Sequence, residues 1–162
     1  MTELQRLRAD HDAAILDFEV ANRAYFAKSI NDRGDAFFTK YAEQHQTLLD
    51  DQASGKFAFH VLVDDDGTIV GRFNLYDISE STAVVGYRVA QSVAGQGVAT
   101  SALRDLSHVA RRDYGLRTLR AATSDENIAS QRVLEKVGFI ADGPTQVGGR
   151  PGQWYELDLT AD

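Results

Sequence analysis

The chain has 162 residues, of which 43% are hydrophobic and 25% charged, with only two prolines, and this balance excludes a disordered or low-complexity protein. Because it holds no cysteine, disulfides, thiolate catalysis and cysteine-ligated zinc are excluded as well. The formal net charge of −7 argues against direct nucleic-acid binding, which needs a basic surface, and fits either a cationic substrate or plain solubility.

No apolar run approaches the length of a membrane span, and the opening residues MTELQRLRADHD lack the apolar core of a signal peptide. There is no internal repeat, linker or low-complexity tract, so we expect one domain over residues 1–162. We also expect a cytoplasmic protein that binds no membrane, as a monomer or a homodimer.

The first half of the chain predicts two helices followed by a hairpin. A short strand around residues 3–7 precedes a helical stretch that begins with Asp10 as its N-cap and runs to about residue 27. After Gly34, apolar side chains recur every three or four residues as far as Leu49, which indicates a second helix. Strands over 57–63 and 68–76 then flank an Asp-Asp-Asp-Gly turn.

The second half predicts a strand–helix–strand unit. A strand over 82–89 leads through a glycine-bearing loop into a helix that ends at Gly115, and a strand over 118–123 follows. Such a crossover makes the two strands parallel neighbours. A helix over 127–137 comes next, followed by strands over 139–141 and 153–159 on either side of a second glycine-rich loop.

The first of these loops, AGQGVAT over residues 94–100, is a candidate anion site. The first N–H groups of a helix lack internal partners and lie at the positive end of its dipole, so they attract phosphates. Gly95 and Gly97 let the backbone approach a ligand closely. A nucleotide P-loop is excluded because its lysine is missing, and a dinucleotide fingerprint fits poorly because Thr100 replaces its third glycine. The alternative is a turn that only joins strand to helix.

Two segments resemble one enzyme family. The AGQGVA stretch resembles the (Gln/Arg)-x-x-Gly-x-(Gly/Ala) loop of GNAT-type N-acetyltransferases, with Gly97 and Ala99 matching and Ala94 replacing the usual Gln or Arg. The segment NIASQRVLEKVGF, from Asn127 to Phe139, resembles the family's second signature, with its NxxS start and EKxGF close. The segment GQGVAT looks like the corresponding loop sequence of the RimJ/RimL-like branch, which acetylates protein N-termini and includes relatives with other amine substrates.

The resemblance implies a fold, a reaction and a cosubstrate. The fold expected is an α/β domain of α+β type, the GNAT acyl-CoA N-acyltransferase fold. It has a mixed, mostly antiparallel sheet of about seven strands with a central parallel pair, flanked by about four helices. The reaction expected is transfer of the acetyl group of acetyl-CoA to a primary amine, above all the N-terminal α-amino group of a ribosomal or other protein, by direct attack in a ternary complex. No metal is expected.

The resemblance also assigns contacts with acetyl-CoA. The strand before the loop parts from its neighbour in this family, which leaves backbone N–H groups, here those of Val89 and Arg88, for the thioester carbonyl. Asn127 and Ser130, one helical turn apart, are expected beside the pantetheine arm and sulfur, although Asn127 also suits a helix cap. The full set of expected contacts is Arg88, Val89, Ala94, Gly95, Gln96, Gly97, Val98, Ala99, Thr100, Asn127 and Ser130.

The resemblance identifies the catalytic residues less directly than the cofactor contacts. Many enzymes of this kind carry a tyrosine just before the Glu-Lys pair to protonate the leaving thiolate, but Leu134 stands there, so Ser130 is our candidate for delivering that proton. Glu80, just before the parting strand, is our candidate base, with Glu19, Glu43 and Asp77 as alternatives. An α-amine with a pKa near 8 is about a tenth neutral at pH 7, so an enzyme without a strong base favours α-amines over lysine.

Two other functions stay open on the sequence. One is acetylation of a small-molecule amine such as a polyamine, an amino acid or an antibiotic. The other is a non-catalytic CoA-binding sensor module, which the leucine at position 134 suggests. The four histidines are widely spaced and indicate no metal site, and His45, on an apolar helical face, is expected as a buried structural residue rather than a base.

Overall fold

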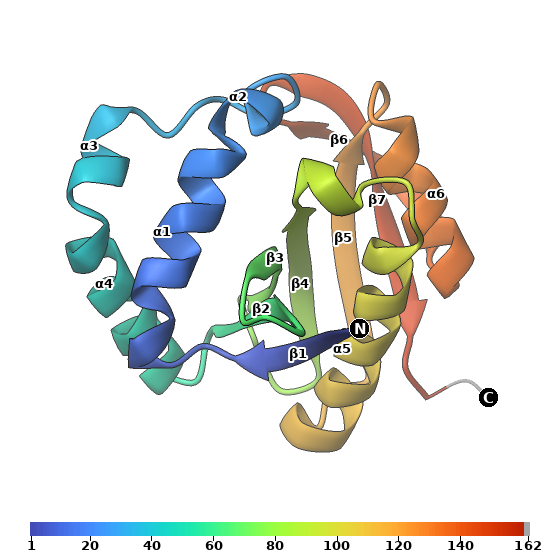
Figure 1. Ribbon diagram of the computed structural model, residues 1–162. Helices are drawn as coiled ribbons and strands as arrows, with labels where there is room; N and C mark the ends of the chain where they lie inside the picture. The colour runs from blue at the N-terminus through green and yellow to red at the C-terminus, as the bar shows by residue number, and fades with distance from the viewer. Residues whose placement is uncertain (161–162) are drawn as a thin grey trace.

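Seven strands form one mixed sheet in the order β1-β2-β3-β4-β5-β7-β6 in the computed structural model, which describes residues 1–160. β4 and β5 are parallel, and the other neighbouring strands are antiparallel (Figure 1), which confirms the predicted sheet. The strands are β1 Thr2–Arg6, β2 Ala58–Asp64, β3 Ile69–Tyr76, β4 Thr82–Val89, β5 Thr118–Ser124, β6 Ile140–Val147 and β7 Arg150–Asp158.

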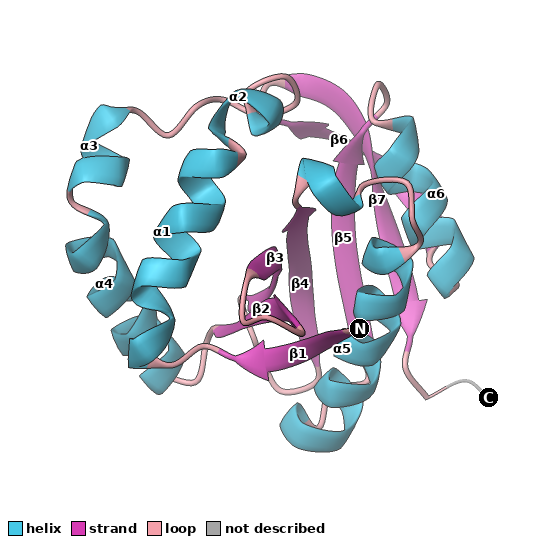
Figure 2. Ribbon diagram, viewed as in Figure 1, coloured by secondary structure: helices cyan, strands magenta, loops and turns pink. Residues whose placement is uncertain are grey.

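The helices fall into two groups, with α1, α3 and α4 on the left of the view and α5 and α6 on the right (Figure 2). Short 3₁₀ turns precede α1 and α5, at Ala9–His11 and Gln91–Val93. Residues 1–160 hold six α-helices rather than about four, namely α1 Asp12–Ala21, α2 Arg23–Phe26, α3 Asp35–Thr39, α4 Tyr41–Ala53, α5 Val98–Tyr114 and α6 Ile128–Val137.

The expectation of one unbroken helix over 10–27 is wrong, because the helix breaks at Asn22. The Asn22 side chain donates from Nδ2 to the Phe18 carbonyl oxygen at 2.9 Å, and its Oδ1 accepts from the Gln91 backbone N–H at 3.0 Å. An asparagine side chain that bonds backbone groups in this way competes with the helix's own hydrogen bonds. The Asn22 side chain therefore links the end of α1 to the segment that follows β4.

The second predicted helix is also two helices, α3 and α4. Thr39, the last residue of α3, donates from its hydroxyl to the Asp35 carbonyl oxygen at 3.2 Å. Threonine back-bonding of this kind bends helices. Lys40 then leaves the helical region, with φ −116° and ψ 27°, before α4 starts at Tyr41.

The middle of the sheet is covered on both faces. Nearly every residue of β2 and β3 is buried, which is the pattern of strands packed on both sides rather than on one. Helix α1 packs on β3, α4 on β2, and α5 on β1, β3 and β4. The apolar α5 side chains that enter this core are Ala102, Leu103, Leu106 and Ala110, at the spacing of one helical face.

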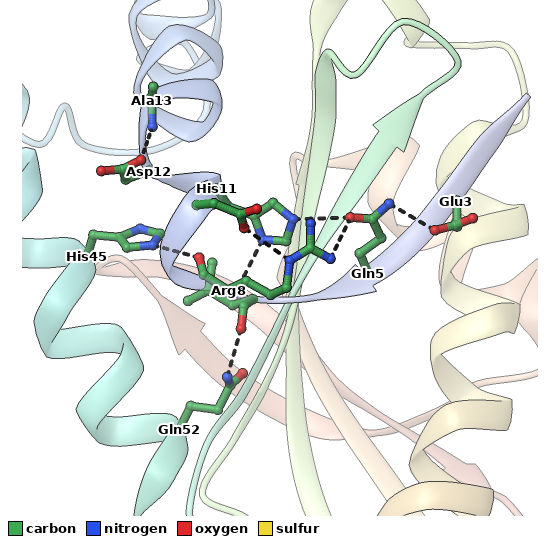
Figure 3. Close-up of polar contacts among 10 residues, drawn as sticks. Glu3, Gln5, Arg8, His11, Asp12, Ala13, His45 and Gln52 are labelled. Carbon is green, nitrogen blue, oxygen red and sulfur yellow. Dashed lines mark hydrogen bonds and ion pairs between the residues drawn. The ribbon is translucent and has the colours of Figure 1, made fainter.

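Polar contacts hold α4 to the start of the chain (Figure 3). His45 Nε2 lies 2.9 Å from the Arg8 carbonyl oxygen, and its Nδ1 lies 3.1 Å from the Tyr41 hydroxyl. Gln52 donates from Nε2 to the Leu7 carbonyl oxygen at 3.1 Å. His45 is thus a buried structural residue, as predicted, and α4 is fixed against the sheet.

The C-terminal strands are longer than the sequence suggested. Strand β6 extends to Val147, and a two-residue turn of Gly148 and Gly149, with φ 57° and 81°, leads directly into β7 at Arg150. Positive φ at both positions is what a type I′ hairpin turn requires. The expected glycine-rich loop is therefore mostly strand.

Candidate functional site

The parallel pair β4 and β5 separates after a short contact. Thr82, Ala83 and Val84 pair with residues 118–120 of β5, and no β4–β5 pairing follows Val84 within the described residues. Pairing of β4 with β3 continues to Val89. The second half of β4 therefore has one edge without a strand partner, as expected for the parting strand, and backbone N–H groups on that edge are free to meet a ligand.

The glycine loop ends beside this opening and starts α5. Gly97 is the N-cap of α5 with φ 78°, and Gly95 has φ 75°, a left-handed conformation that other residues adopt only with strain. No heavy atom lies within 4 Å of where a Cβ would stand on either glycine. Backbone conformation, rather than lack of space, accounts for both glycines, and the exposed loop leaves room over the first N–H groups of α5.

A cavity of about 240 Å³, here called the loop cavity, lies beside the loop and reaches from α2 to α6. The sequence-predicted contacts that line it are Arg88, Val89, Ala94, Gly95, Ala99, Asn127 and Ser130. Gln96, Gly97, Val98 and Thr100 lie next to it in the loop and the first turn of α5, but do not line it. Gln96 instead donates from Nε2 to the Ser92 carbonyl oxygen at 3.1 Å, which ties down the loop.

Asn127 caps α6 and faces the loop cavity at the same time. Its side-chain oxygen accepts from the Ser130 backbone N–H at 3.1 Å, the ordinary geometry of a helix N-cap. The capping role left open on the sequence is therefore present. The cap also fixes the first turn of α6 and with it the Ser130 hydroxyl.

Tyr87 is a residue that the sequence analysis missed. Its hydroxyl lies 3.2 Å from Ser130 Oγ, so β4 and α6 are joined by a hydrogen bond across the loop cavity. Its ring stacks on Phe73 with centroids 5.4 Å apart and an interplanar angle of 4°. Burial raises the pKa of Tyr87, so the phenol keeps its proton at neutral pH. The only signal in the sequence was its place in the parting strand.

A second cavity of about 370 Å³, here called the α4 cavity, lies on the other side of the opening. Its outer wall comes from α4 and the chain before it, including Arg33, Leu48 and Asp51. Its floor comes from side chains that alternate along β3, namely Arg72, Asn74 and Tyr76, and from Gly86 and Arg88 of β4.

Gly86 is needed for the shape of that floor. A Cβ at Gly86 would stand 2.9 Å from the Tyr76 ring, so any larger residue would displace the ring. Asn74 donates from Nδ2 to the Tyr76 hydroxyl at 3.0 Å, while its buried Oδ1 has no hydrogen-bond partner within the described residues. An amide oxygen left unpaired beside a cavity is suited to accept from a ligand N–H.

The two cavities meet at Ile30, Tyr87 and Arg88, which line both of them. Tyr87 and Arg88 are neighbours on β4, so their side chains point to opposite faces of the strand. Tyr87 lies with Phe73 and Ser130, whereas Arg88 lies opposite Arg72. One ligand in each cavity would therefore approach the other at the parted edge of β4.

A buried ion cluster underlies this junction. Glu19 of α1, whose side chain is 2% exposed, accepts at Oε2 from Arg72 Nη1 at 3.1 Å and from Arg88 Nη2 at 2.8 Å. Arg88 also lies over the Phe26 ring, with Cζ 4.6 Å from the centroid. Burial lowers the pKa of Arg88 to about 10, although the Glu19 carboxylate acts in the opposite direction. Glu19, held by two guanidinium groups, is a poor general base.

Other candidates from the sequence lie away from the junction. Glu80 is exposed in the turn between β3 and β4, at the far end of β4 from Val89, and lines neither cavity. Leu134 is 1% exposed and belongs to the core. Among residues 1–160 no cluster of three or more His, Cys, Asp or Glu side chains could hold a metal ion. None of the helices described is both long and apolar enough to cross a membrane.

The comparisons with known proteins agree with this geometry. A model of the acetyltransferase (GNAT) domain matches residues 2–140. The probable N-acetyltransferase YjcK of Bacillus subtilis (strain 168) is 27% identical over 137 residues, which cover 79% of this chain and 74% of that protein.

Solved structures share the fold, and RimJ and RimL enzymes are among them. RimL, the ribosomal L7/L12 α-N-protein acetyltransferase in complex with coenzyme A, has a TM-score of 0.86 at 18% identity, over 99% of this chain and 96% of that one. A chimera of spermidine N-acetyltransferase SpeG from Vibrio cholerae and hSSAT has a TM-score of 0.77 at 15% identity, over 98% and 96%. With its parted parallel strands, its glycine loop and a family model that matches most of its length, the chain belongs to the GNAT acetyltransferase family.

Proposed function

We propose that the protein transfers the acetyl group of acetyl-CoA to the N-terminal α-amino group of a protein, by direct attack within a ternary complex. The observation that carries the proposal is the meeting of two cavities at Tyr87 and Arg88, on the parted edge of β4. The loop cavity takes the thioester end of acetyl-CoA and the α4 cavity takes the amine. RimL, an α-N-protein acetyltransferase of the same fold, supports the choice of acceptor.

The donor is held mainly by backbone groups. Residues 94–100 bind the pyrophosphate through the loop and the first N–H groups of α5, and Asn127 and Ser130 lie along the pantetheine arm. The backbone N–H group of Val89 polarises the thioester carbonyl from the edge of β4 that β5 leaves free, whereas the N–H of Arg88 faces Arg72 of β3, because successive N–H groups of a strand alternate between its two edges. Donors fixed in a strand need no reorganisation when charge develops on the oxygen.

Ser130 delivers the proton to the leaving thiolate, and Tyr87 supplies it. The amine nitrogen attacks the thioester carbon and loses a proton, the C–S bond breaks, and the sulfur takes the hydroxyl proton of Ser130. The Tyr87 hydroxyl, 3.2 Å away, replaces that proton, and the phenolate regains one from the water that carries off the amine proton. Tyr87, on β4, thus compensates for the leucine at position 134 of α6.

The choice of a general base for the amine comes from the sequence alone. Glu80 remains the proposed base, and its exposed place at the far end of β4 means that it can act only through intervening water. Asp51 is a carboxylate that does line the α4 cavity. Because about a tenth of an α-amine is already neutral at pH 7, neither carboxylate has to be a strong base. A cytoplasmic location and a monomeric or homodimeric state also remain predictions.

Thermal stability with separate ligands tests the donor site first. Acetyl-CoA or CoA at about 100 times its dissociation constant adds roughly 2.7 kcal/mol, so the melting temperature should rise on the order of 5 to 10 °C. NAD and ATP serve as controls and should leave it unchanged. A rise in melting temperature with NAD alone, or no rise with any of the four ligands, would contradict acetyl-CoA as the donor.

Gly97→Trp should weaken acetyl-CoA binding at least about tenfold, because the indole fills the space over the first turn of α5. The matched control is Gly115→Trp at the other end of α5, where φ is 66° and a Cβ also meets no atom within 4 Å. Both variants carry the strain of a left-handed residue, about 1–2 kcal/mol. Calorimetric titration with acetyl-CoA measures the affinity of each variant. If folded Gly97→Trp protein bound acetyl-CoA as tightly as the wild type, the glycine loop would not be part of the donor site.

Acetylation of a small-molecule amine is the rival enzymatic function, and the fold shared with a spermidine N-acetyltransferase favours keeping it under test. A panel of N-terminal peptides beside spermidine and free amino acids separates the two. Binding of acetyl-CoA without turnover of any amine would favour a sensor module instead.

A further inference from the structure

The charges around the α4 cavity are opposite in sign to the charge of the whole protein. Three arginines, Arg33, Arg72 and Arg88, line it, against the single carboxylate of Asp51. Glu19 adds a second carboxylate behind Arg72 and Arg88. The cavity is therefore locally cationic, although the chain carries a net charge of −7.

The buried part of this surface has one positive charge too many. Glu19 accepts from both Arg72 and Arg88, whose side chains are 7% and 17% exposed, and one carboxylate can offset only one guanidinium. Removing an unpaired charge from water is costly unless a counter-ion joins it. The three arginines line one cavity, Arg72 lies opposite Arg88 on the neighbouring strand, and the positive charges of Arg33 and Arg72 help to lower the pKa of Arg88.

Arg33 is placed to meet an anion at the cavity wall. It lies in the chain between α2 and α3, with Cζ 5.0 Å from the centre of the Phe37 ring, and makes no ion pair within residues 1–160. Its neighbour Arg23 differs, because Asp32 and Asp35 accept from its guanidinium at 2.7 and 2.8 Å. Two carboxylates thus neutralise Arg23, whereas Arg33 at the cavity wall has no anionic partner within residues 1–160.

The floor also offers a partner for an N–H group. Asn74, only 9% exposed, lines the cavity beside Arg72 and keeps its Oδ1 without a partner in the described part of the chain. A ligand that donates an N–H to Asn74 and presents an anion to the arginines would satisfy both features at once.

We infer that the amine acceptor carries a carboxylate close to its reactive α-amine, so that acidic N-termini are preferred to basic ones and polyamines are excluded. The inference rests on the proposed function and names the substrate class of the same site. A cationic acceptor would place like charges together beside Arg33, Arg72 and Arg88, which is unfavourable, whereas a carboxylate would meet opposite charges there. The carboxylate can belong to an acidic side chain next to the N-terminus or to a free amino acid.

The test uses peptides that begin Ser-Asp, Ser-Ala and Ser-Lys and are otherwise identical, beside free amino acids and spermidine. We expect kcat/KM to fall in that order across the peptides, with the acidic one about tenfold above the basic one and the gap narrowing at high salt. Turnover of free amino acids in preference to the acidic peptide would assign the carboxylate to the acceptor's own terminus. Spermidine should not be acetylated.

Arg33→Gln should cut the preference for the acidic peptide about threefold, through a higher KM, because an ion pair with an exposed arginine contributes only modestly. Lys40→Gln, an exposed cation outside both cavities, is the matched control and should behave as wild type. Equal or better turnover of the basic peptide or of spermidine overturns this inference alone. No turnover of any amine, with acetyl-CoA bound, overturns the proposed function and the inference with it.

Discussion

Ser130→Ala and Tyr87→Phe are each expected to lower kcat about 100-fold, with the KM for acetyl-CoA nearly unchanged. General acids contribute about 10² to 10⁴, and the lower end applies because a thiolate is already a good leaving group. The two hydroxyls are 3.2 Å apart and serve one proton transfer, so the double variant should lose no more than the worse single variant. Steady-state rates with one good peptide acceptor measure all three.

The Tyr87→Phe variant keeps the ring that stacks on Phe73, so its fold should be intact. Tyr114→Phe is the matched control, since it removes a hydroxyl on α5 that lines neither cavity. If Tyr87→Phe kept the wild-type kcat, Ser130 would have to draw its proton from water, and the pairing would be structural.

Glu19→Ala should cost about 3–5 kcal/mol of unfolding free energy, because it leaves two buried guanidinium groups without their carboxylate. For a domain of this size the melting temperature should fall on the order of 10 °C. Urea unfolding gives the free energy directly, and thermal unfolding gives the temperature.

The matched control for that loss is Asp105→Ala, an exposed carboxylate in the middle of α5, which should change stability by less than about 0.5 kcal/mol. A loss below about 1 kcal/mol for Glu19→Ala would mean that water replaces the carboxylate. The cluster would then be more open than its exposure indicates.

Local patterns were enough to predict the strand–helix–strand unit that carries the glycine loop. The crossover from β4 through α5 to β5 follows from apolar spacing and from glycines at both ends of α5, Gly97 and Gly115. These signals are local, since a left-handed cap or a 3.6-residue period depends on neighbours in the chain. Asn127 and Ser130 were instead assigned from the resemblance to the second GNAT signature, and their contact with acetyl-CoA stays a prediction.

Contacts between distant segments could not be predicted in this way. Tyr87 meets Ser130 only because α6 returns over the parted strands, and Glu19 meets Arg72 and Arg88 only because α1 lies on β3. The break at Asn22 has the same origin, since its partner Gln91 is 69 positions away. Tertiary packing overrode a sound helical pattern there.

The two cavities come from different stretches of the chain, and that separation bears on how such an enzyme can change over evolution. Residues 30–59 provide the outer wall of the α4 cavity, the proposed amine site, whereas residues 89–133 provide most of the lining of the loop cavity, the proposed thioester site. Helices α3 and α4 can therefore be lengthened, shortened or replaced to admit a new amine while the acetyl-donating machinery is inherited intact. Helix α1 limits this freedom, since any redesign that loses Glu19 also disturbs the arginines beneath the junction of the two cavities.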